Sequence, residues 1–474
     1  MDTARQEVVI YRSVDPVTGE EFARFDLAQD AAIDESLARA DDAYRQWCST
    51  PIVERAAVSH RVADILASRV GELADLATRE MGKPRHEAVE ELDLCVSIFR
   101  YYGDHGPKLA ADEHIEAHPG DRAVIQRRPI GVVLGIMPWN FPYYQVARFV
   151  APNLVLGNTI LLKHAESVPQ CAAAIEQVLT DAGLPDGTYQ NLYATHGQVE
   201  RLIADDRVRG VSLTGSERAG SAVAAIAGRY LKKCVLELGG SDPYIVLDTD
   251  DVRGAARLAW QTRMYNTGQT CNSNKRMIVH EEYFRDFVDE LTRLARVMRP
   301  ADPTRDAEPG TYCPLSSRSA AEHLDAQIQD AVTKGAQVHA GGRLGPAPGA
   351  YFAPTVLTAV SKGMRAYHEE LFGPVAVVYS VQSDVEAVEL ANDSVYGLGG
   401  AVFSVHQSRA LDVAGQLEVG MSNVNTPAGE GAAIPFGGVK RSGYGRELGP
   451  LGMDEFANKR LLYVAGQPSS VGND

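Results

Sequence analysis

The sequence predicts an α/β protein with two parallel-sheet domains, and three observations predict it. The chain has 474 residues, 45% of them hydrophobic and 23% charged, which is typical of a globular protein with several cores at roughly 100–200 residues per domain. From about residue 122, short β-rich runs alternate with helical stretches, and this alternation indicates parallel strands joined by helices. A second series of the same kind follows Asp250. We expect the domains to join near the glycine pair Gly239-Gly240.

The first hundred residues, after a turn at Thr18-Gly19, are predicted to be helical. In the clearest helix, apolar residues recur with a 3.6-residue period up to Gly82, and Pro84 follows as a stop signal. The apolar positions of this helix are Val58, Val62, Ile65, Leu66, Leu73, Leu76 and Ala77. We expect it to pack one face against the core.

The elements of the two α/β series follow in order. In the first series we expect strands at 123–125, 131–136, 159–162, 211–214 and 244–247, and helices at 171–182 and 198–204. In the second series we expect a helix to about Tyr265, a strand at 276–280, an amphipathic helix at 282–297, and strands at 337–342 and 375–379. Each domain would therefore have one sheet covered by helices.

Charge and cysteine usage exclude several classes of protein. The formal net charge is −16, so the overall field repels nucleic acids and anionic membrane surfaces, and we expect neither as a partner. The N-terminus, Met1-Asp-Thr-Ala-Arg-Gln-Glu, lacks a signal-peptide pattern, and no apolar run approaches ~18 residues, so we expect a cytoplasmic protein. The cysteines form no CxxC pair, which predicts neither disulfides nor a metal site. They are Cys48, Cys95, Cys171, Cys234, Cys271 and Cys313.

Two residues stand out as candidates for covalent chemistry. Cys271 follows an apolar periodic segment and is surrounded by small polar residues, so it is expected on a turn, although most cysteines are simply buried small hydrophobes. Glu237 ends an apolar strand just before a glycine pair, where a charged group is costly unless it is paired or used. A structural ion pair is the alternative for Glu237.

Polar groups also follow three predicted strands. Asn140 is the only polar side chain in the rigid turn Pro138-Trp-Asn-Phe-Pro, which suits an oxyanion donor or, alternatively, a helix cap. Thr214-Gly-Ser opens a helix whose backbone N–H groups could face a phosphate. Lys163 and Glu166 follow the strand at 159–162, at the edge where α/β proteins bind nucleotides. Taken alone, each of these signals is weak.

Together these motifs resemble the aldehyde dehydrogenase superfamily. The resemblance runs in the family's order through nearly the whole chain, from Asp15-Pro-Val-Thr-Gly-Glu to Gly443-Tyr-Gly-Arg-Glu-Leu. The intervening motifs are Pro138-Trp-Asn-Phe-Pro, Lys163, Thr214-Gly-Ser, Glu237-Leu-Gly-Gly, Gly268-Gln-Thr-Cys, Glu370-Leu-Phe-Gly-Pro-Val and Pro435-Phe-Gly-Gly-Val-Lys. Leu162-Lys-His-Ala and Glu237-Leu-Gly-Gly-Ser-Asp-Pro look most like the bacterial succinate-semialdehyde dehydrogenase branch.

The resemblance implies an aldehyde dehydrogenase fold with a Rossmann-like cofactor domain, a catalytic domain and a small β oligomerisation arm. The implied NAD-binding domain comprises residues 1–111 and 130–239, and the catalytic domain residues 240–445. Residues 112–129 and 446–474 would form the arm and C-terminal strand, which implies a homodimer or homotetramer.

The resemblance also implies a role for each candidate. Cys271 would attack the aldehyde to form a thiohemiacetal, and after hydride transfer a thioester, while the Asn140 amide and the Cys271 N–H hold the oxyanion. Glu237 would activate the water that hydrolyses the thioester. Contacts to the cofactor are implied for Pro138, Trp139, Lys163, Glu166, Gly215, Ser216, Leu238, Glu370 and Phe372. No metal is implied.

The Glu166 carboxylate predicts a preference for NAD over NADP, because it would accept hydrogen bonds from the adenosine ribose and repel a 2′-phosphate. For the substrate, Arg148 matches an arginine that binds the distal carboxylate of succinic semialdehyde in that branch, with Tyr144 on the same helix face. An arginine paired with an acidic neighbour at a domain contact is the alternative. Tyr265 stands where some of those enzymes have a second arginine, and Glu430 could repel an anion.

The sequence therefore predicts NAD(P)-dependent oxidation of an aldehyde, with a short semialdehyde favoured slightly over a neutral aliphatic or aromatic aldehyde. A cysteine acyl hydrolase or acyltransferase without redox chemistry is the main alternative from another class. A catalytically silent relative is the third. Lys163, Glu166 and Glu370 would serve no purpose in the hydrolase, and the intact set of Cys271, Glu237 and Asn140 argues against the silent relative.

Overall fold

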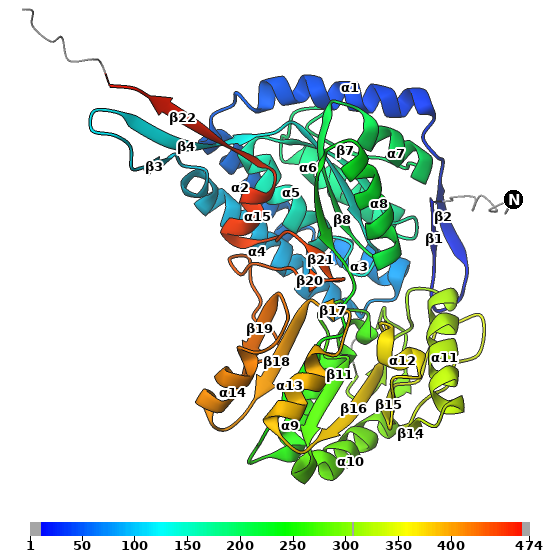
Figure 1. Cartoon of the computed structure of the whole chain (residues 1–474). Helices are drawn as coiled ribbons and strands as arrows, with labels where there is room; N and C mark the ends of the chain where they lie inside the picture. Colours follow the sequence, from blue (N-terminus) through cyan, green and yellow to red (C-terminus); the bar gives the residue numbers. More distant parts are fainter. Residues whose placement is uncertain (1–10, 306–307, 467–474) are drawn as a thin grey trace, which may run out of the picture.

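The computed structural model describes residues 11–305 and 308–466 and has two α/β units with a projecting three-stranded arm (Figure 1). The predicted fold class, two parallel-sheet units and a β arm, is confirmed. The N-terminal segment Met1–Glu7 and the outer ends of the predicted domain spans lie outside the described residues.

The first unit contains a six-stranded sheet of order β21-β9-β8-β5-β6-β7, parallel except for β21. Its strands are β5 (Val132–Met137), β6 (Thr159–His164), β7 (Tyr189–Asn191), β8 (Val208–Thr214), β9 (Lys233–Glu237) and β21 (Gly443–Tyr444). The connecting helices are α5 (Tyr144–Leu156), α6 (Pro169–Asp181), α7 (His196–Ala204) and α8 (Glu217–Arg229). The carboxyl ends of β5, β6, β8 and β9 therefore meet at one edge, where such sheets bind ligands.

The N-terminal region supplies helices that cover this sheet, but it begins with a hairpin. The strands β1 (Tyr11–Val14) and β2 (Glu21–Phe25) flank the predicted Thr18-Gly19 turn. The helices are α1 (Asp30–Trp47), α2 (Ile52–Ser68), α3 (Val70–Met81) and α4 (Arg85–Leu109). The prediction of one continuous helix ending at Gly82 was wrong, because Arg69 leaves helical geometry at φ −113°, ψ 12° and separates α2 from α3. Both pieces still bury the predicted apolar face.

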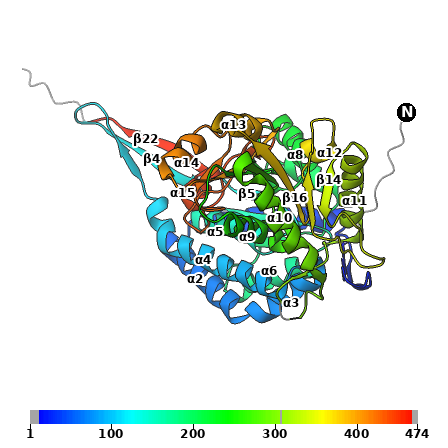
Figure 2. The same cartoon turned by 90° about the horizontal axis from the view of Figure 1, so that it is seen from below.

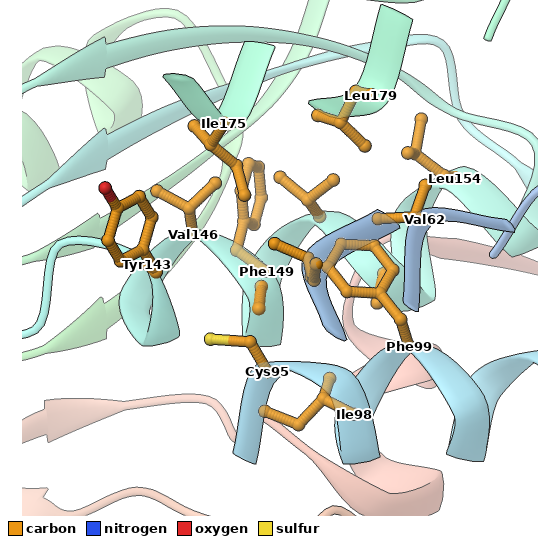
Figure 3. Packing of buried hydrophobic residues seen from close by; sticks show 14 of the residues in the cluster. Val62, Cys95, Ile98, Phe99, Tyr143, Val146, Phe149, Leu154, Ile175 and Leu179 are labelled. Carbon is orange, nitrogen blue, oxygen red and sulfur yellow. The ribbon is translucent and has the colours of Figure 1, made fainter. Parts of the chain in front are cut away.

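One hydrophobic core of the first unit lies between α2, α4, α5 and α6 (Figure 3). Phe149 of α5 and Phe99 of α4 point into this cluster together with Val62 and Ile175. Gly135 in β5 makes this packing possible, because a Cβ there would come within 2.6 Å of the Phe149 ring. The core thereby fixes α5, the helix that carries Tyr144 and Arg148, against the sheet.

The second unit contains a seven-stranded sheet of order β14-β15-β16-β11-β10-β18-β19, parallel except for β14. Its strands are β10 (Pro243–Val246), β11 (Arg276–His280), β14 (Gln337–Ala340), β15 (Thr355–Thr358), β16 (Val375–Val381), β18 (Gly399–Phe403) and β19 (Met421–Val424). Its helices are α9 (Val252–Met264), α10 (Glu281–Val297), α11 (Arg318–Thr333), α12 (Arg365–His368), α13 (Asp384–Asn392) and α14 (Gln407–Ala414). The predicted strand at 244–247 thus opens the second sheet rather than closing the first.

The arm is an antiparallel sheet of β3 (Glu113–Ile115), β4 (Arg122–Pro129) and β22 (Ala457–Val464), which projects from the first unit (Figures 1 and 2). The strand expected at 123–125 therefore belongs to the arm and not to the parallel series. In β22, Leu461 and Tyr463 are 55% and 47% exposed. Short α15 (Gly449–Glu455) precedes β22. The remaining elements are β12 (Arg299–Pro300), β13 (Thr311–Tyr312), β17 (Tyr396–Gly397), β20 (Val439–Lys440) and the 3₁₀ turn η1 (Tyr265–Gly268).

Within residues 11–305 and 308–466, every helix is too short or too polar to span a membrane. All six cysteines lie in this part of the chain and are free.

Candidate active site

Cys271 lies on a strained turn between α9 and β11. After α9, the residues Asn266 and Thr267 have φ values of 49° and 52°, and Gly268 has φ +76°. A side chain at Gly268 would collide with the carbonyl oxygen of Gly373, so only glycine lets the loop pass there. The turn leaves Cys271 half-buried beside the first core, as its small polar neighbours predicted.

Cys271 opens onto a cavity of about 490 Å³ between the two units. The predicted substrate residues Tyr144, Arg148 and Tyr265 all line the same cavity. Phe141 stacks on Tyr265, with ring centroids 6.2 Å apart, and packs edge-on against Tyr144 at 6.1 Å. Aromatic side chains and one guanidinium therefore form part of the cavity wall.

The surroundings of the Cys271 thiol disfavour its charged, thiolate form. Burial raises the pKa of the thiol to about 11, while the charges of Arg148 and Lys275 oppose this increase and those of Glu370 and Asp242 add to it. At this pKa the thiol is almost entirely protonated at neutral pH, so burial outweighs the two cations.

Asn140 lies beside the Cys271 loop. Its Nδ2 donates to the carbonyl oxygen of Gln269 at 3.1 Å, and its own backbone carbonyl accepts from Asn266 Nδ2 at 2.9 Å. The capping alternative fails, because α5 begins at Tyr144 with no side-chain cap. The amide is therefore fixed against the loop that carries the candidate nucleophile.

Glu237 is the last residue of β9 and is 2% exposed. Neither of its carboxylate oxygens finds a hydrogen-bond donor among the described residues. Burial and then the nearby Glu447 raise its pKa well above the ordinary value, and Arg148 opposes them. Gly437 makes room for it, because a Cβ there would lie 2.5 Å from Glu237 Oε1. Such an unpaired carboxylate is suited to take a proton.

Arg148 forms an ion pair with an acidic residue, which the sequence analysis gave only as the alternative to binding the substrate carboxylate. Its Nε contacts Glu447, its Nη2 donates to Thr214 Oγ1 at 3.3 Å, and its side chain is fully buried. Sequence reasoning missed Glu447, although this residue lies inside the quoted Gly443-Tyr-Gly-Arg-Glu-Leu motif. Nη1 of Arg148 is buried and makes no hydrogen bond within the described chain. One N–H edge of the guanidinium therefore remains for another acceptor.

The candidate cofactor residues follow the carboxyl ends of neighbouring strands. Pro138 and Trp139 follow β5, Lys163 is the penultimate residue of β6, and Gly215 and Ser216 join β8 to α8. Ser216 caps α8 by accepting from the Ala219 N–H at 3.3 Å. The N-terminus of α8 follows the carboxyl end of β8 directly, so it lies at the edge of the sheet, as a phosphate site requires.

The Glu166 carboxylate forms an ion pair at this edge of the sheet. It pairs with the Lys163 ammonium, and His196 Nε2 lies 3.7 Å from its Oε1. The prediction that Glu166 repels a 2′-phosphate treated the carboxylate as an isolated charge. With Lys163 bound to it, much of that repulsion is neutralised.

Three further candidates lie where the two units meet. Trp139 and Phe372 pack edge to face, with centroids 5.7 Å apart. Leu238 packs against α8, where Gly220 leaves space for it. Glu370 accepts from the Gly240 N–H at 3.2 Å and lies 3.0 Å from Lys275 Nζ. A side chain at Gly239 would collide with this carboxylate, so the glycine pair forms a cradle for it.

These residues fit a dinucleotide lying along the sheet edge toward a cysteine. The helix N-terminus suits the pyrophosphate, and the carboxylate above the Gly239-Gly240 cradle suits a ribose. A thiol, a fixed amide and an unpaired buried carboxylate beside such an edge define a cysteine-dependent dehydrogenase that acts on carbonyl carbon.

The chain belongs to the aldehyde dehydrogenase family, whose family model matches residues 3–462. It is an NAD(P)-dependent aldehyde-oxidising enzyme, and the non-redox hydrolase and the silent relative are set aside. It is 52% identical over 453 residues to the succinate-semialdehyde dehydrogenase [NADP(+)] of Deinococcus radiodurans, covering 95% of this chain and 94% of that one. A Mycobacterium tuberculosis protein named succinate-semialdehyde dehydrogenase [NADP(+)] 1 is 41% identical, with coverage of 96% and 99%. The crystal structure of succinic semialdehyde dehydrogenase from Streptococcus pyogenes in complex with NADP+ superimposes with a TM-score of 0.93 at 40% identity, covering 96% and 100%.

These relatives correct the predicted cofactor preference. Their names carry NADP, and the Streptococcus pyogenes structure holds NADP+, so the preference for NAD inferred from Glu166 was wrong. The Lys163–Glu166 pair gives the physical reason, because it cancels the charge on which that inference depended.

Proposed function

We propose that this chain oxidises succinic semialdehyde to succinate with NADP. The names of its relatives support both choices. The observation that carries the substrate proposal is Arg148, whose buried Nη1 has no acceptor among the described residues and whose side chain lines the same cavity as Cys271. A terminal carboxylate is the acceptor that a buried guanidinium prefers.

The proposed chemistry begins with the thiol. Cys271 Sγ attacks the aldehyde carbon, and the Asn140 amide and the Cys271 N–H donate to the oxygen that becomes negative. The hydride acceptor is the nicotinamide of the bound cofactor, and hydride loss converts the thiohemiacetal into a thioester. Glu237 then takes a proton from the water that hydrolyses the thioester, a role that suits its raised pKa and its unpaired oxygens.

The residues proposed to hold the cofactor are arranged one after another along the edge of the sheet. Lys163 and Glu166 would hold the adenosine ribose, where their ion pair leaves little net charge to repel a 2′-phosphate. Gly215 and Ser216 would hold the pyrophosphate, and Pro138 and Leu238 would line its path. Glu370 would hold the nicotinamide ribose, and Phe372, which packs against Trp139, would lie beside the nicotinamide ring.

We further propose a homo-oligomer assembled through the arm. Strand β22 pairs with β4 along one edge only, and it exposes Leu461, Tyr463 and Val464. Pairing with the same strand of a second copy covers this edge.

We propose a division of the chain into three parts. They are residues 1–111 with 130–239, residues 240–445, and residues 112–129 with 446–474, apart from one short segment. The segment at 443–444 lies in the first sheet through β21.

The test is a matched panel of aldehydes and cofactors. Succinic semialdehyde, butanal and benzaldehyde are each assayed with NADP and with NAD at equal concentrations, following reduced cofactor at 340 nm. We expect kcat/KM for succinic semialdehyde to exceed that for butanal by at least tenfold, since a charge-assisted contact is worth ~1.5–3 kcal/mol. A preference for butanal or benzaldehyde would overturn the substrate proposal and leave aldehyde oxidation intact.

A further inference from the structure

Lys275 lies at the rear of the nucleophile loop, four residues after Cys271 and immediately before β11. It is 1% exposed. Its Nζ lies 2.7 Å from the carbonyl oxygen of Thr270, 2.7 Å from that of Cys271, and 3.0 Å from Glu370 Oε1. An ammonium has three N–H donors, and these three acceptors account for all of them. Burying a lysine this deeply is costly, so its contacts need a reason beyond packing.

The glycine pair lets these groups converge. A side chain at Gly239 would collide with Glu370, and a Cβ at Gly240 would come within 2.7 Å of the Cys271 carbonyl oxygen. Glu370 also accepts from the Gly240 N–H at 3.2 Å. Both glycines are therefore required for the carboxylate and the loop carbonyls to reach the same ammonium.

The two carbonyls that Lys275 holds belong to the peptide groups on either side of Cys271. The Thr270 carbonyl and the Cys271 N–H share one planar trans peptide, so they point in opposite directions. When Lys275 draws the Thr270 oxygen to the rear of the loop, the Cys271 N–H must face the front, toward the cavity. A cation on the carbonyl also polarises the amide and strengthens the N–H as a donor.

We propose that Lys275 is a positioning residue that orients the Cys271 N–H toward the aldehyde oxygen and joins this loop to the cofactor residue Glu370. The proposal rests on the proposed role of Cys271 as nucleophile, but it does not depend on which aldehyde is the substrate. Nothing in the reaction requires Lys275 to gain or lose a proton.

Lys275 also acts on the thiol through its charge. The charged and titratable groups around the thiol are Arg148 and Tyr144 on α5, Asp242 before β10, Lys275 before β11 and Glu370 after α12. The two cations favour the thiolate and the carboxylates disfavour it. Removing Lys275 leaves Arg148 alone against Glu370 and Asp242, so the thiol of the cofactor-free enzyme should ionise at higher pH.

The experiment compares Lys275→Met with Lys440→Met in the full-length enzyme. Lys440 is a matched control, because its Nζ also contacts two carbonyl oxygens, those of Asn392 and Ser394, and one carboxylate, Glu418, but away from the cavity. The first readout is the rate at which iodoacetamide alkylates Cys271 in the cofactor-free enzyme from pH 6 to 10, followed by mass spectrometry of the Cys271 peptide. The second is kcat for aldehyde oxidation, and the third is Kd for NADP by quenching of tryptophan fluorescence.

For Lys275→Met we expect the alkylation profile to move to higher pH by about one unit, as for loss of one nearby charge. We expect kcat to fall ~10²-fold or more, as for loss of one oxyanion donor. Kd for NADP should rise several-fold, because Glu370 loses its partner. Lys440→Met should match the wild type in all three.

A second variant separates geometry from charge. Lys275→Arg keeps the cation, so the alkylation profile should stay near that of the wild type, but its planar fork cannot reach the same three acceptors, so kcat should still fall. Wild-type kcat in a folded Lys275→Met or Lys275→Arg enzyme would overturn the inference, and an unshifted alkylation profile in Lys275→Met would overturn the effect of its charge on the thiol. If alkylation of Cys271 in the wild type leaves activity intact, the proposed function fails instead.

Discussion

Two buried charge clusters flank Cys271 and differ in how completely their hydrogen bonds are satisfied. The Arg148 cluster comprises Arg148, Glu447 and Glu237, and the Lys275 cluster comprises Lys275 and Glu370 with the carbonyls of Thr270 and Cys271. In the Lys275 cluster every ammonium donor has an acceptor. In the Arg148 cluster, Nη1 and both oxygens of Glu237 find none among the described residues.

This difference distinguishes groups that hold the structure in place from groups that are proposed to take part in the reaction. A fully satisfied buried network rigidifies its surroundings, whereas a buried polar atom without a partner is costly and is retained where it serves function. We therefore propose that the Lys275 cluster holds the loop still and that the Arg148 cluster offers atoms to substrate, water and protons. Variants of Cys271, Glu237, Arg148 and Glu430 test that distinction.

Cys271 stands between the clusters, and its removal should have the largest effect. We expect Cys271→Ala to lower aldehyde oxidation by more than ~10³-fold, because no other group can form the thiohemiacetal. NADP should bind as in the wild type, measured by fluorescence titration, since both clusters survive. Substantial oxidation by this variant would show that the thiol is not the nucleophile.

Glu237→Gln should affect only the second half-reaction. Thioester hydrolysis should slow by ~10²–10⁴-fold, with hydride transfer much less affected, so a stopped-flow trace should show a burst of NADPH before a slow steady state. In the wild type, the steady-state rate should rise with pH through a pKa well above that of an ordinary carboxyl, because only the ionised Glu237 accepts a proton. If both phases slow equally, the base is another residue.

Arg148 carries two roles that a pair of variants can separate. Arg148→Met leaves Glu447 buried without its partner, which should cost ~3–5 kcal/mol of stability and weaken oxidation of butanal as well as of succinic semialdehyde. Adding Glu447→Gln should recover much of the thermal midpoint. In that double variant, kcat/KM for succinic semialdehyde should stay at least tenfold below the wild type, while that for butanal recovers. Equal recovery for both aldehydes would make Arg148 purely structural.

Glu430 should have the smallest effect. With Glu90 it belongs to the lining of the cavity, and both side chains are exposed, so each weakly repels an anionic substrate. Glu430→Gln should raise kcat/KM for succinic semialdehyde ~2–5-fold at low ionic strength, and the gain should vanish in high salt. Butanal is the control substrate and should be unaffected. A gain that persists in high salt would indicate a steric and not an electrostatic effect.

Much of the site was predictable because residue type and position in a strand carry the signal. Glu237 ends an apolar strand and Asn140 lies between two prolines, so both were candidates, and the resemblance to the family implied their place beside Cys271. Glu447 and Lys275 were not predicted. Each is a charged residue in a segment that becomes buried, but burial depends on what packs against the segment, and the partners Arg148 and Glu370 lie 299 and 95 residues away in the chain.

The α/β class, most strands and helices, the residues at the sheet edge and the family could all be predicted from the sequence. These follow from local periodicity, turn residues and motif order, all of which act over short stretches of chain. Three features became apparent only in the folded chain: α2 and α3 separate at Arg69, Glu166 is paired with Lys163, and Arg148 is shared between Glu447 and the cavity. A charge acts according to its nearest partner and its exposure to water, and folding alone brings those partners together.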